Sequence, residues 1–468
     1  MRRIIAGKIG RRGVACILAV SLCLTSGFIG GGRERTEPAA LAAEQPSEEE
    51  VWEYEGLTSG EAKITGYKGT DTQLHIPETI QNSEGDSLAV TEIADNAFKD
   101  CTNLISVEIP KSVTKIGIGM LSGCSNIREI TVSEENQYYD SREACNAIIE
   151  KNTNKLVAGC QTSRIPDDIQ IIGEYAFAGC TMLTDVTFPA GLTEIGGYAF
   201  EGCSGITSIE IPASVTKIGV RVFAGCNLEE IKVDEENEKY TSGDNCNAIM
   251  DSTRLIYGCK NTTIPEGIKS ICSYAFNDCA GLESIRIPST VLWIDSYAFC
   301  DCSNLQQIDF AEESSVREID SYAISGCEKL KSISLPSSIT VVLPHTFDGC
   351  SSLERVEVPE GVTKLYYSAF EGCSALKEIN LPESLTSIGQ SAFSGCASLS
   401  TVKIPSGITV LETGIFWGCA SLTEIELPSS ITKICGMAFR GCASLTAVKI
   451  PDSVTDIGEY VFGVCDLS

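Results

Sequence analysis

Cysteine is the residue type in this chain whose number and spacing most strongly suggest chemistry. The 468 residues include 23 cysteines but only two histidines, His75 and His345. Cysteines can form disulfides, ligate metal ions or act as nucleophiles. Fourteen of them form a series at Cys101, Cys124, Cys180, Cys203, Cys226, Cys279, Cys302, Cys327, Cys350, Cys373, Cys396, Cys419, Cys442 and Cys465. Ten of the thirteen intervals are 23 residues, so the series indicates one structural unit repeated along the chain.

The residues between the cysteines predict the elements that position them. In one unit, Ile425 and Leu427 alternate with polar residues, which indicates a short strand with one buried face. Pro428 ends that strand because it lacks a backbone N–H group, and Ile431 and Ile434 begin a second inward-facing run. A single coil cannot bury these side chains, whereas stacked coils bury them continuously. The sequence therefore predicts one elongated solenoid in place of the three domains that the length suggests.

Stacking places equivalent side chains of successive coils in the same orientation, facing the core. We therefore predict that the series is a structural ladder of buried thiols that donate weakly to backbone carbonyls. Its most regular part is Cys350, Cys373, Cys396, Cys419 and Cys442. Disulfides along the ladder are the alternative. No metal site is expected, because no Cys-x₂-Cys pair has a partner pair, and the two histidines lie in different units and are interpreted as structural or exposed.

Two units are longer than the others and contain additional cysteines. Each reads as a β-hairpin, with turns around Asn152-Thr153 and Ser252-Thr253. Cross-strand neighbours lie within disulfide reach. Cys145–Cys160 and Cys246–Cys259 are therefore candidate disulfides, with paired buried thiols as the alternative.

The outward-facing position of the first strand is the candidate ligand-binding surface. Its clearest members are Glu357, Asn380, Lys403, Glu426 and Lys449. We expect this column to line the concave face, where solenoids usually bind. The alternating signs of its last charged members also fit cross-strand charge pairing without any ligand. The column contains no acidic pair in adjacent coils, so no catalytic residue is assigned.

A second column holds tyrosines, two residues before the recurring phenylalanine. Its members are Tyr175, Tyr198, Tyr274, Tyr297, Tyr322 and Tyr460. An exposed tyrosine row suits contacts with protein or sugar. Half-buried packing along a corner of each coil is the other interpretation.

The N-terminus predicts a targeting segment. A basic stretch is followed by an apolar run over residues 14–29 and by small residues over 39–43, a pattern typical of a secretory signal peptide. We assign residues 1–43 to the signal peptide, 44–100 to an N-terminal cap with a first irregular repeat, and 101–468 to the solenoid. An uncleaved N-terminal anchor is the alternative for the first segment.

The fuller motif resembles a known family. Residues 203–226 follow Cys-x-x-x-x-x-Ile-x-Ile-Pro-x-Ser-Val-Thr-x-Ile-Gly-x-x-x-Phe-x-Gly, and this string is similar to the BspA-type leucine-rich repeat. The resemblance extends over about residues 64–468. It implies an α/β-type but mostly β, right-handed leucine-rich repeat solenoid with 23-residue coils and two hairpin-containing long repeats. It also implies a surface protein that attaches to host matrix or to other cells.

Composition and resemblance together predict a class of function. The net charge of −28 argues against nucleic acid and anionic membranes as partners. We expect a secreted or cell-surface, non-enzymatic binding or adhesion module for a protein or glycan on a cell or matrix surface. No cofactor is expected, and no membrane span after signal cleavage. A structural spacer or display scaffold is the first alternative, and a β-helix-like polysaccharide-degrading enzyme is the second.

Overall fold

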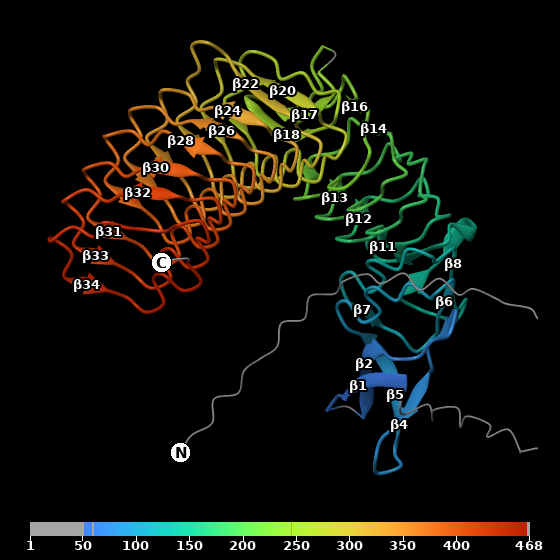
Figure 1. Ribbon diagram of the computed structural model, residues 1–468. Helices are drawn as coiled ribbons and strands as arrows, with labels where there is room; N and C mark the ends of the chain where they lie inside the picture. Colours follow the sequence, from blue (N-terminus) through green and yellow to red (C-terminus); the bar gives the residue numbers. More distant parts are fainter. Residues whose placement is uncertain (1–50, 59, 245, 466–468) are drawn as a thin grey trace, which may run out of the picture. The chain divides into compact units, whose positions relative to one another are not determined.

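The computed structural model describes residues 51–468 except 59, 245 and 466–468. The predicted signal peptide, residues 1–43, lies outside the described residues. The regular elements of the described part are β-strands and one 3₁₀ turn, η1 (Arg142–Ala144). Figure 1 shows them as a series of stacked coils, so the prediction of a mostly β repeat solenoid is confirmed. Among the described residues, no helix is long and apolar enough to cross a membrane.

Most regular coils contribute one strand to a first parallel ladder, which is divided into several short sheets. These strands are β3 (Gln73–His75), β6 (Ser106–Ile109), β8 (Glu129–Val132), β14 (Ser208–Ile211), β16 (Glu230–Val233), β20 (Ser284–Ile287), β22 (Gln307–Phe310), β24 (Ser332–Ser334), β26 (Arg355–Glu357), β28 (Glu378–Ile379), β30 (Thr401–Lys403) and β32 (Glu424–Glu426). Their inward residues are buried and their outward residues exposed, as in β30, where Val402 is buried between exposed Thr401 and Lys403. Strands pair in register one repeat apart, so Val402 lies opposite Ile425.

A second parallel ladder follows the proline turn of each coil. Its two-residue strands are β7 (Lys115–Ile116), β12 (Ile171–Ile172), β13 (Glu194–Ile195), β15 (Lys217–Ile218), β19 (Ser270–Ile271), β21 (Trp293–Ile294), β23 (Glu318–Ile319), β25 (Val341–Val342), β27 (Lys364–Leu365), β29 (Ser387–Ile388), β31 (Val410–Leu411), β33 (Lys433–Ile434) and β34 (Asp456–Ile457). The second residue of most strands faces the core. These strands are too short to be stable alone, and the pairing with neighbouring coils maintains them.

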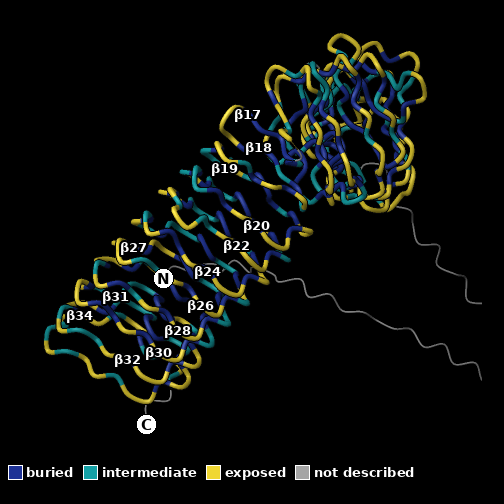
Figure 2. Tube along the Cα trace, turned by 90° about the horizontal axis from the view of Figure 1, so that it is seen from above, coloured by how far each residue is buried: buried dark blue, intermediate teal, exposed yellow. Residues whose placement is uncertain are grey.

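The third side of each coil is a turn that carries the recurring phenylalanine and cysteine. Phenylalanine rings of successive coils stack nearly parallel, with centroids 5.6 Å apart for Phe370–Phe393 and again for Phe393–Phe416. These three side chains are fully buried. Figure 2 shows the buried residues along the inside of the coils and the exposed ones at the corners. The core therefore consists of three clusters of buried side chains, divided at the two long units, and within each cluster successive regular coils add equivalent side chains.

The two long units contain the predicted hairpins. Their strands are β10 (Ala147–Glu150) with β11 (Lys155–Gly159), and β17 (Ala248–Asp251) with β18 (Arg254–Gly258). A short strand, β9 (Tyr139–Asp140), pairs with β10. Strands β11 and β18 then join the second ladder by parallel pairing with β12 and β19. Each hairpin therefore widens one coil and begins a new segment of the second ladder, because β7 pairs only with β5 and β15 ends the sheet that starts at the first hairpin.

The N-terminal part of the described chain is an irregular sheet. Its strands are β1 (Trp52–Gly56), β2 (Glu61–Tyr67), β4 (Thr79–Gln81) and β5 (Ser87–Ile93). β1 pairs antiparallel with β2, and β4 pairs antiparallel with β5. β5 then pairs in parallel with β7 and continues into the second ladder. This sheet therefore supplies antiparallel partners at the N-terminal end of the described coils.

Candidate functional site

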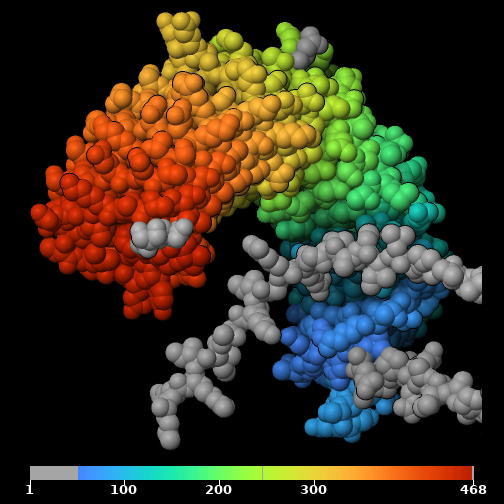
Figure 3. Space-filling view, viewed as in Figure 1, coloured from blue at the N-terminus to red at the C-terminus, as the bar shows by residue number. Residues whose placement is uncertain are grey.

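The five residues of the predicted ligand-binding column lie in one exposed row along the first ladder. Glu357 lies opposite Asn380, and Lys403 and Lys449 flank Glu426. All five are exposed to solvent, because each is the outward neighbour of a core residue that is buried or, in the case of Val448, partly buried. Figure 3 shows the coils that carry them, in orange and red, as one continuous surface. We call these five residues the charged row.

The charges in this row pair differently from the expectation of alternating cross-strand ion pairs. Lys403 Nζ lies 2.7 Å from Glu383 Oε1, in the turn of the preceding coil, instead of pairing with Glu426. This hydrogen bond lowers the pKa of the Glu383 carboxyl, which also accepts from Ser406. Within the described residues, Glu426 and Lys449 have no ion-pair partner inside 4.0 Å. The row therefore ends in one negative and one positive side chain that are both free to contact a ligand.

A groove of about 750 Å³ lies beside this end of the row. It is lined by Lys403, Glu426 and Lys449 together with the apolar side chains Leu427 and Ile450. Ile450 is itself 38% exposed. The combination of apolar surface and free charges is typical of ligand sites, in which polar groups orient a partner held by apolar contact.

The tyrosine column forms a second continuous row, on a corner of the coils. Tyr175 and Tyr198 stack with ring centroids 4.5 Å apart, and Tyr274, Tyr297 and Tyr322 stack at 4.9 and 4.8 Å. The Arg221 guanidinium lies between the two groups, 5.6 Å from the ring of Tyr198 and 5.5 Å from that of Tyr274. His345 extends the row, since its ring stacks on Tyr322 at 4.3 Å. We call these seven residues the planar stack.

The geometry of the planar stack favours packing over sugar recognition. A sugar ring binds to the open face of an aromatic side chain, but inside the stack each ring face is covered by its neighbour. The tyrosines are half-buried, and their φ angles lie between 57° and 63°. This left-handed conformation is unfavourable for bulky residues, and it recurs at equivalent positions outside the stack, such as Met437 and Tyr460. Tyr460 lies outside the stack and is 67% exposed.

The cysteine ladder lies inside the core as protonated thiols. Each regular thiol donates to the carbonyl of the phenylalanine position one coil earlier, for example Cys396 to Phe370 at 3.2 Å. Burial raises the pKa of Cys350 to about 12 and that of Cys373 well above its ordinary value. A thiol that keeps its proton is a poor nucleophile and a poor metal ligand. The ladder therefore contributes packing and weak hydrogen bonds.

The structure does not bring the two cysteines of either hairpin together. The expectation of a disulfide in each hairpin is therefore corrected. All four residues, Cys145, Cys160, Cys246 and Cys259, are free thiols. The register pairs Ala147 with Gly159, so continuing it by one residue places Asn146, and not Cys145, opposite Cys160. A one-residue offset turns side chains to opposite faces of a hairpin.

Core packing agrees with this offset. Cys145 packs with the coils that follow the first hairpin, and Cys160 packs with the coils that precede it. Cys246 and Cys259 are divided in the same way at the second hairpin. The two cysteines of each hairpin therefore belong to different parts of the core.

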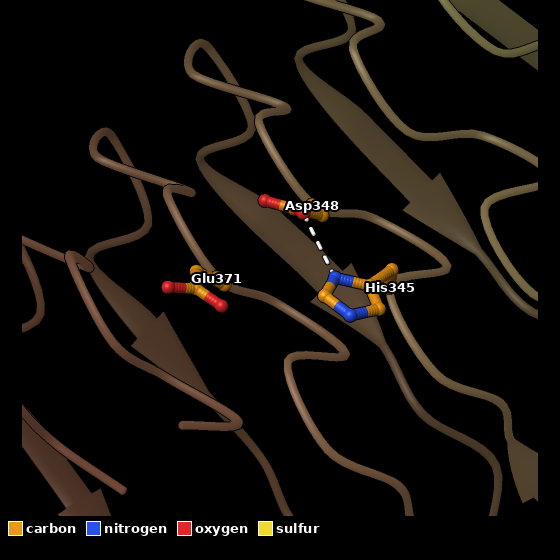
Figure 4. Close-up of side chains that lie close together, drawn as sticks. All are labelled: His345, Asp348 and Glu371. Atoms are coloured by element: carbon orange, nitrogen blue, oxygen red, sulfur yellow. Dashed lines mark hydrogen bonds and ion pairs between the residues drawn. The ribbon is translucent and has the colours of Figure 1, made fainter. Parts of the chain in front are cut away.

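The structure also brings together three residues that the sequence analysis did not connect. His345 Nδ1 lies 2.9 Å from Asp348 Oδ2 (Figure 4). The Glu371 carboxylate lies close enough that one ligand atom from each of the three residues falls within 4.8 Å of the others. Burial raises the pKa of Asp348, and the hydrogen bond with His345 opposes that rise. His345 therefore contacts a carboxylate of its own coil in addition to the ring of Tyr322.

A signal for this cluster was present in the sequence. Asp348 and Glu371 are 23 residues apart, so the repeat places them at equivalent positions of successive coils. His345 occupies the tyrosine position of the same coil as Asp348. Asp348 and Glu371 do not belong to the outward column of the first strand, because they lie on another side of the coil.

The coil length and the two parallel ladders define a repeat solenoid of the leucine-rich type. The family model described as "BspA type Leucine rich repeat region (6 copies)" matches residues 78–152, 147–249, 253–377 and 342–468. These segments cover most of the sequence, and the chain belongs to the BspA-type leucine-rich repeat family. The resemblance inferred from the repeat motif is confirmed.

Solved structures of bacterial leucine-rich repeat proteins are similar to this chain. A leucine-rich cell surface protein from Faecalibacterium prausnitzii A2-165 is 26% identical, covering 75% of this chain and 92% of its own, with a TM-score of 0.46. A leucine-rich repeat protein from Bacteroides ovatus ATCC 8483 is 24% identical, covering 89% and 92% respectively, with a TM-score of 0.40. No curated protein matches the chain. The family is therefore the narrowest class that is established.

Proposed function

We propose that this protein is a secreted or cell-surface, non-enzymatic binding module that attaches to a protein or glycan on a cell or matrix surface. Membership of the BspA-type family and the secretory pattern of residues 1–43 support this location. The observation that carries the binding role is the charged row. It ends in the unpaired charges of Glu426 and Lys449 beside a partly apolar groove of about 750 Å³.

The arrangement of this surface suits recognition by many modest contacts. Successive coils present one outward side chain each in the first ladder, and the coils are held in register by parallel pairing. The preorganised backbone limits the entropy lost on binding. Apolar contact with Leu427 and Ile450 would supply affinity, while the two free charges would orient the partner.

The first experiment is an array of matrix proteins and glycans probed with residues 44–468. Binding to a defined component supports the proposal. If no component binds, the adhesion proposal fails and the spacer alternative is favoured. Turnover of an acidic polysaccharide by the purified protein would instead support the enzyme alternative.

The second experiment locates the binding surface with a matched pair of double variants. The test variant is Glu426→Gln/Lys449→Gln, which neutralises the two free charges beside the groove. The control is Glu318→Gln/Lys364→Gln, which removes the same two charge types from exposed positions of the second ladder. The proposal predicts weaker binding only for the test variant. Equal binding by all three proteins would show that another surface carries the interaction.

A further inference from the structure

We propose that His345, Asp348 and Glu371 form a binding site for one divalent transition-metal cation. The three residues offer one imidazole nitrogen and two carboxylate oxygens, with ligand atoms within 4.8 Å of one another. A tetrahedral zinc site with bonds of about 2.1 Å separates its ligand atoms by roughly 3.4 Å. Small side-chain rotations are therefore sufficient to close the site around a cation.

The backbone of the two coils holds these residues in place. His345 N–H donates to Tyr367 O at 3.3 Å, and Gly349 N–H donates to Glu371 O at 2.8 Å. The first bond is donated by His345 itself, and the second is accepted by Glu371, whose carboxylate belongs to the neighbouring coil. Asp348 N–H also donates to His345 O at 3.2 Å, which fixes the turn between them.

The imidazole ring is oriented by aromatic contacts. One face stacks on Tyr322 at 4.3 Å, and the edge of the ring system meets Tyr367 at 5.3 Å with an interplanar angle of 84°. A ring held in this way loses little freedom when it ligates a cation. Such preorganisation by neighbouring groups is what orients ligands in metal sites.

The charge balance of the cluster also favours a cation. Asp348 and Glu371 lie on successive coils, and in the described part of the chain neither has a lysine or arginine partner within 4.0 Å. Their only side-chain partners there are His345 and, for Glu371, the Ser394 hydroxyl at 3.4 Å. A divalent cation would neutralise two adjacent carboxylates that otherwise repel each other.

The ligand set indicates which cations fit. Imidazole suits zinc and related transition metals, whereas calcium and magnesium prefer oxygen ligands alone. The His345 and Asp348 side chains are 18% and 31% exposed, so a cation can reach the site. Three protein ligands leave at least one position for water, or for a carboxylate of a bound partner.

The chain contains its own control for this site. His75 Nδ1 also contacts a carboxylate of the next coil, Glu108 Oε2, at 2.8 Å. Both residues are more exposed, at 69% and 53%. Among the described residues only the His345 cluster adds a third ligand. The His75–Glu108 pair therefore shows, on the same molecule, how a histidine and one carboxylate behave without a third ligand.

The test is calorimetric titration of zinc chloride into residues 44–468 after removal of metal with a chelator. The variants are His345→Asn, because asparagine tolerates the positive φ of 55° at this position, and Glu371→Gln, which keeps the size of the side chain. His75→Asn is the control. We expect one zinc per chain, an affinity loss of at least about 10-fold in each cluster variant, and unchanged binding in the control.

Cobalt spectroscopy separates this site from adventitious binding to the partly exposed cysteines. Cobalt bound by nitrogen and oxygen lacks the intense charge-transfer band that thiolate ligands produce. The proposal is overturned if the parent protein binds no zinc, if both cluster variants bind as the parent does, or if the bound cobalt shows the thiolate band. The two variants alter different ligands, so misfolding of one still leaves the other to decide.

Discussion

Replacement of one ladder cysteine tests whether the thiol acts as an apolar group in the core. Cys396 is fully buried, and its Sγ lies 3.2 Å from Phe370 O. The same carbonyl already accepts the Cys373 N–H at 3.3 Å. Cys396→Ala therefore removes a sulfur atom and a weak hydrogen bond but leaves no carbonyl without a donor.

The expected cost of each replacement follows from these contacts. Removing an atom the size of a methylene costs about 0.8 kcal/mol, and the hydrogen bond adds roughly 0.5–1 kcal/mol. Cys396→Ala should therefore lower the free energy of unfolding by about 1.3–1.8 kcal/mol. Cys396→Ser fills the site with a hydroxyl whose shorter C–O bond reaches the carbonyl poorly. An unsatisfied buried hydroxyl costs roughly 1–3 kcal/mol, so serine should be the less stable variant.

The assay is urea unfolding of residues 44–468, followed by circular dichroism, with midpoints compared at equal slope. The matched control is Cys465→Ala. That thiol makes the same contact, to Phe439 O at 3.1 Å, but it is only partly buried. The predicted order of stability is cysteine, alanine, serine at position 396, with a smaller loss at 465. A serine variant as stable as the alanine variant would refute the apolar role of the thiol.

Four further outcomes are expected. Titration of thiols in the denatured, unreduced chain from residue 44 should find every remaining cysteine free, because the hairpin register separates the candidate pairs; two or four missing thiols would show one or both bridges. Burial raises the pKa of Cys350 from 9.0 to about 12, so above pH 9 the unfolded chain loses this proton while the folded chain keeps it. Stability should thus be independent of the thiol below about pH 8 and fall as pH rises from 9 towards 12, by up to about 1.4 kcal/mol per pH unit for each such thiol; a urea midpoint that stays constant over this range would contradict the argument. Asn136→Ala should lower the free energy of unfolding by roughly 3–5 kcal/mol in the same assay. The reason is that this fully buried amide donates to Pro110 O and Val113 O and accepts hydrogen bonds from two backbone N–H groups. A loss below about 1 kcal/mol would mean that the neighbouring loop rearranges. Glu426→Gln/Lys449→Gln should change the free energy of unfolding by no more than about 0.5 kcal/mol, since both residues are exposed and unpaired. A larger change would show that the pair is structural.

The repeat made most of the fold predictable. Apolar positions recur at the same places in each 23-residue unit, and Ile425 or Ile434 can face only the core if the coils stack. The register of one coil then follows from that of the next, which is why the proline turns and the phenylalanine column agree with the sequence interpretation, although β32 ends at Glu426 and leaves out the predicted Leu427. The hairpins were also predictable as elements, from alternation around a polar turn.

What could not be predicted was the relation between side chains across elements. Whether the two cysteines of a hairpin face each other depends on the strand register. The observed register differs by a single residue from the one assumed, and a one-residue shift turns a side chain to the other face of the hairpin. Lys403 bonds to Glu383 in a turn because the side chain is long enough to reach beyond its strand. The alternation of charge along the row did not show whether Lys403 pairs with Glu383 in the turn or with Glu426 in the next strand.

The sequence by itself determined the repeat, its core residues and the family. The reason is that apolar residues recurring with this period can all be buried only if the coils stack in register. Only the tertiary structure decided which polar groups meet. It shows two unpaired charges at the end of the charged row, a planar stack whose ring faces are covered, and His345 beside two carboxylates from successive coils. Such contacts depend on side-chain reach and on pairing between coils. A difference of a few ångströms decides them, and a spacing pattern does not contain that information.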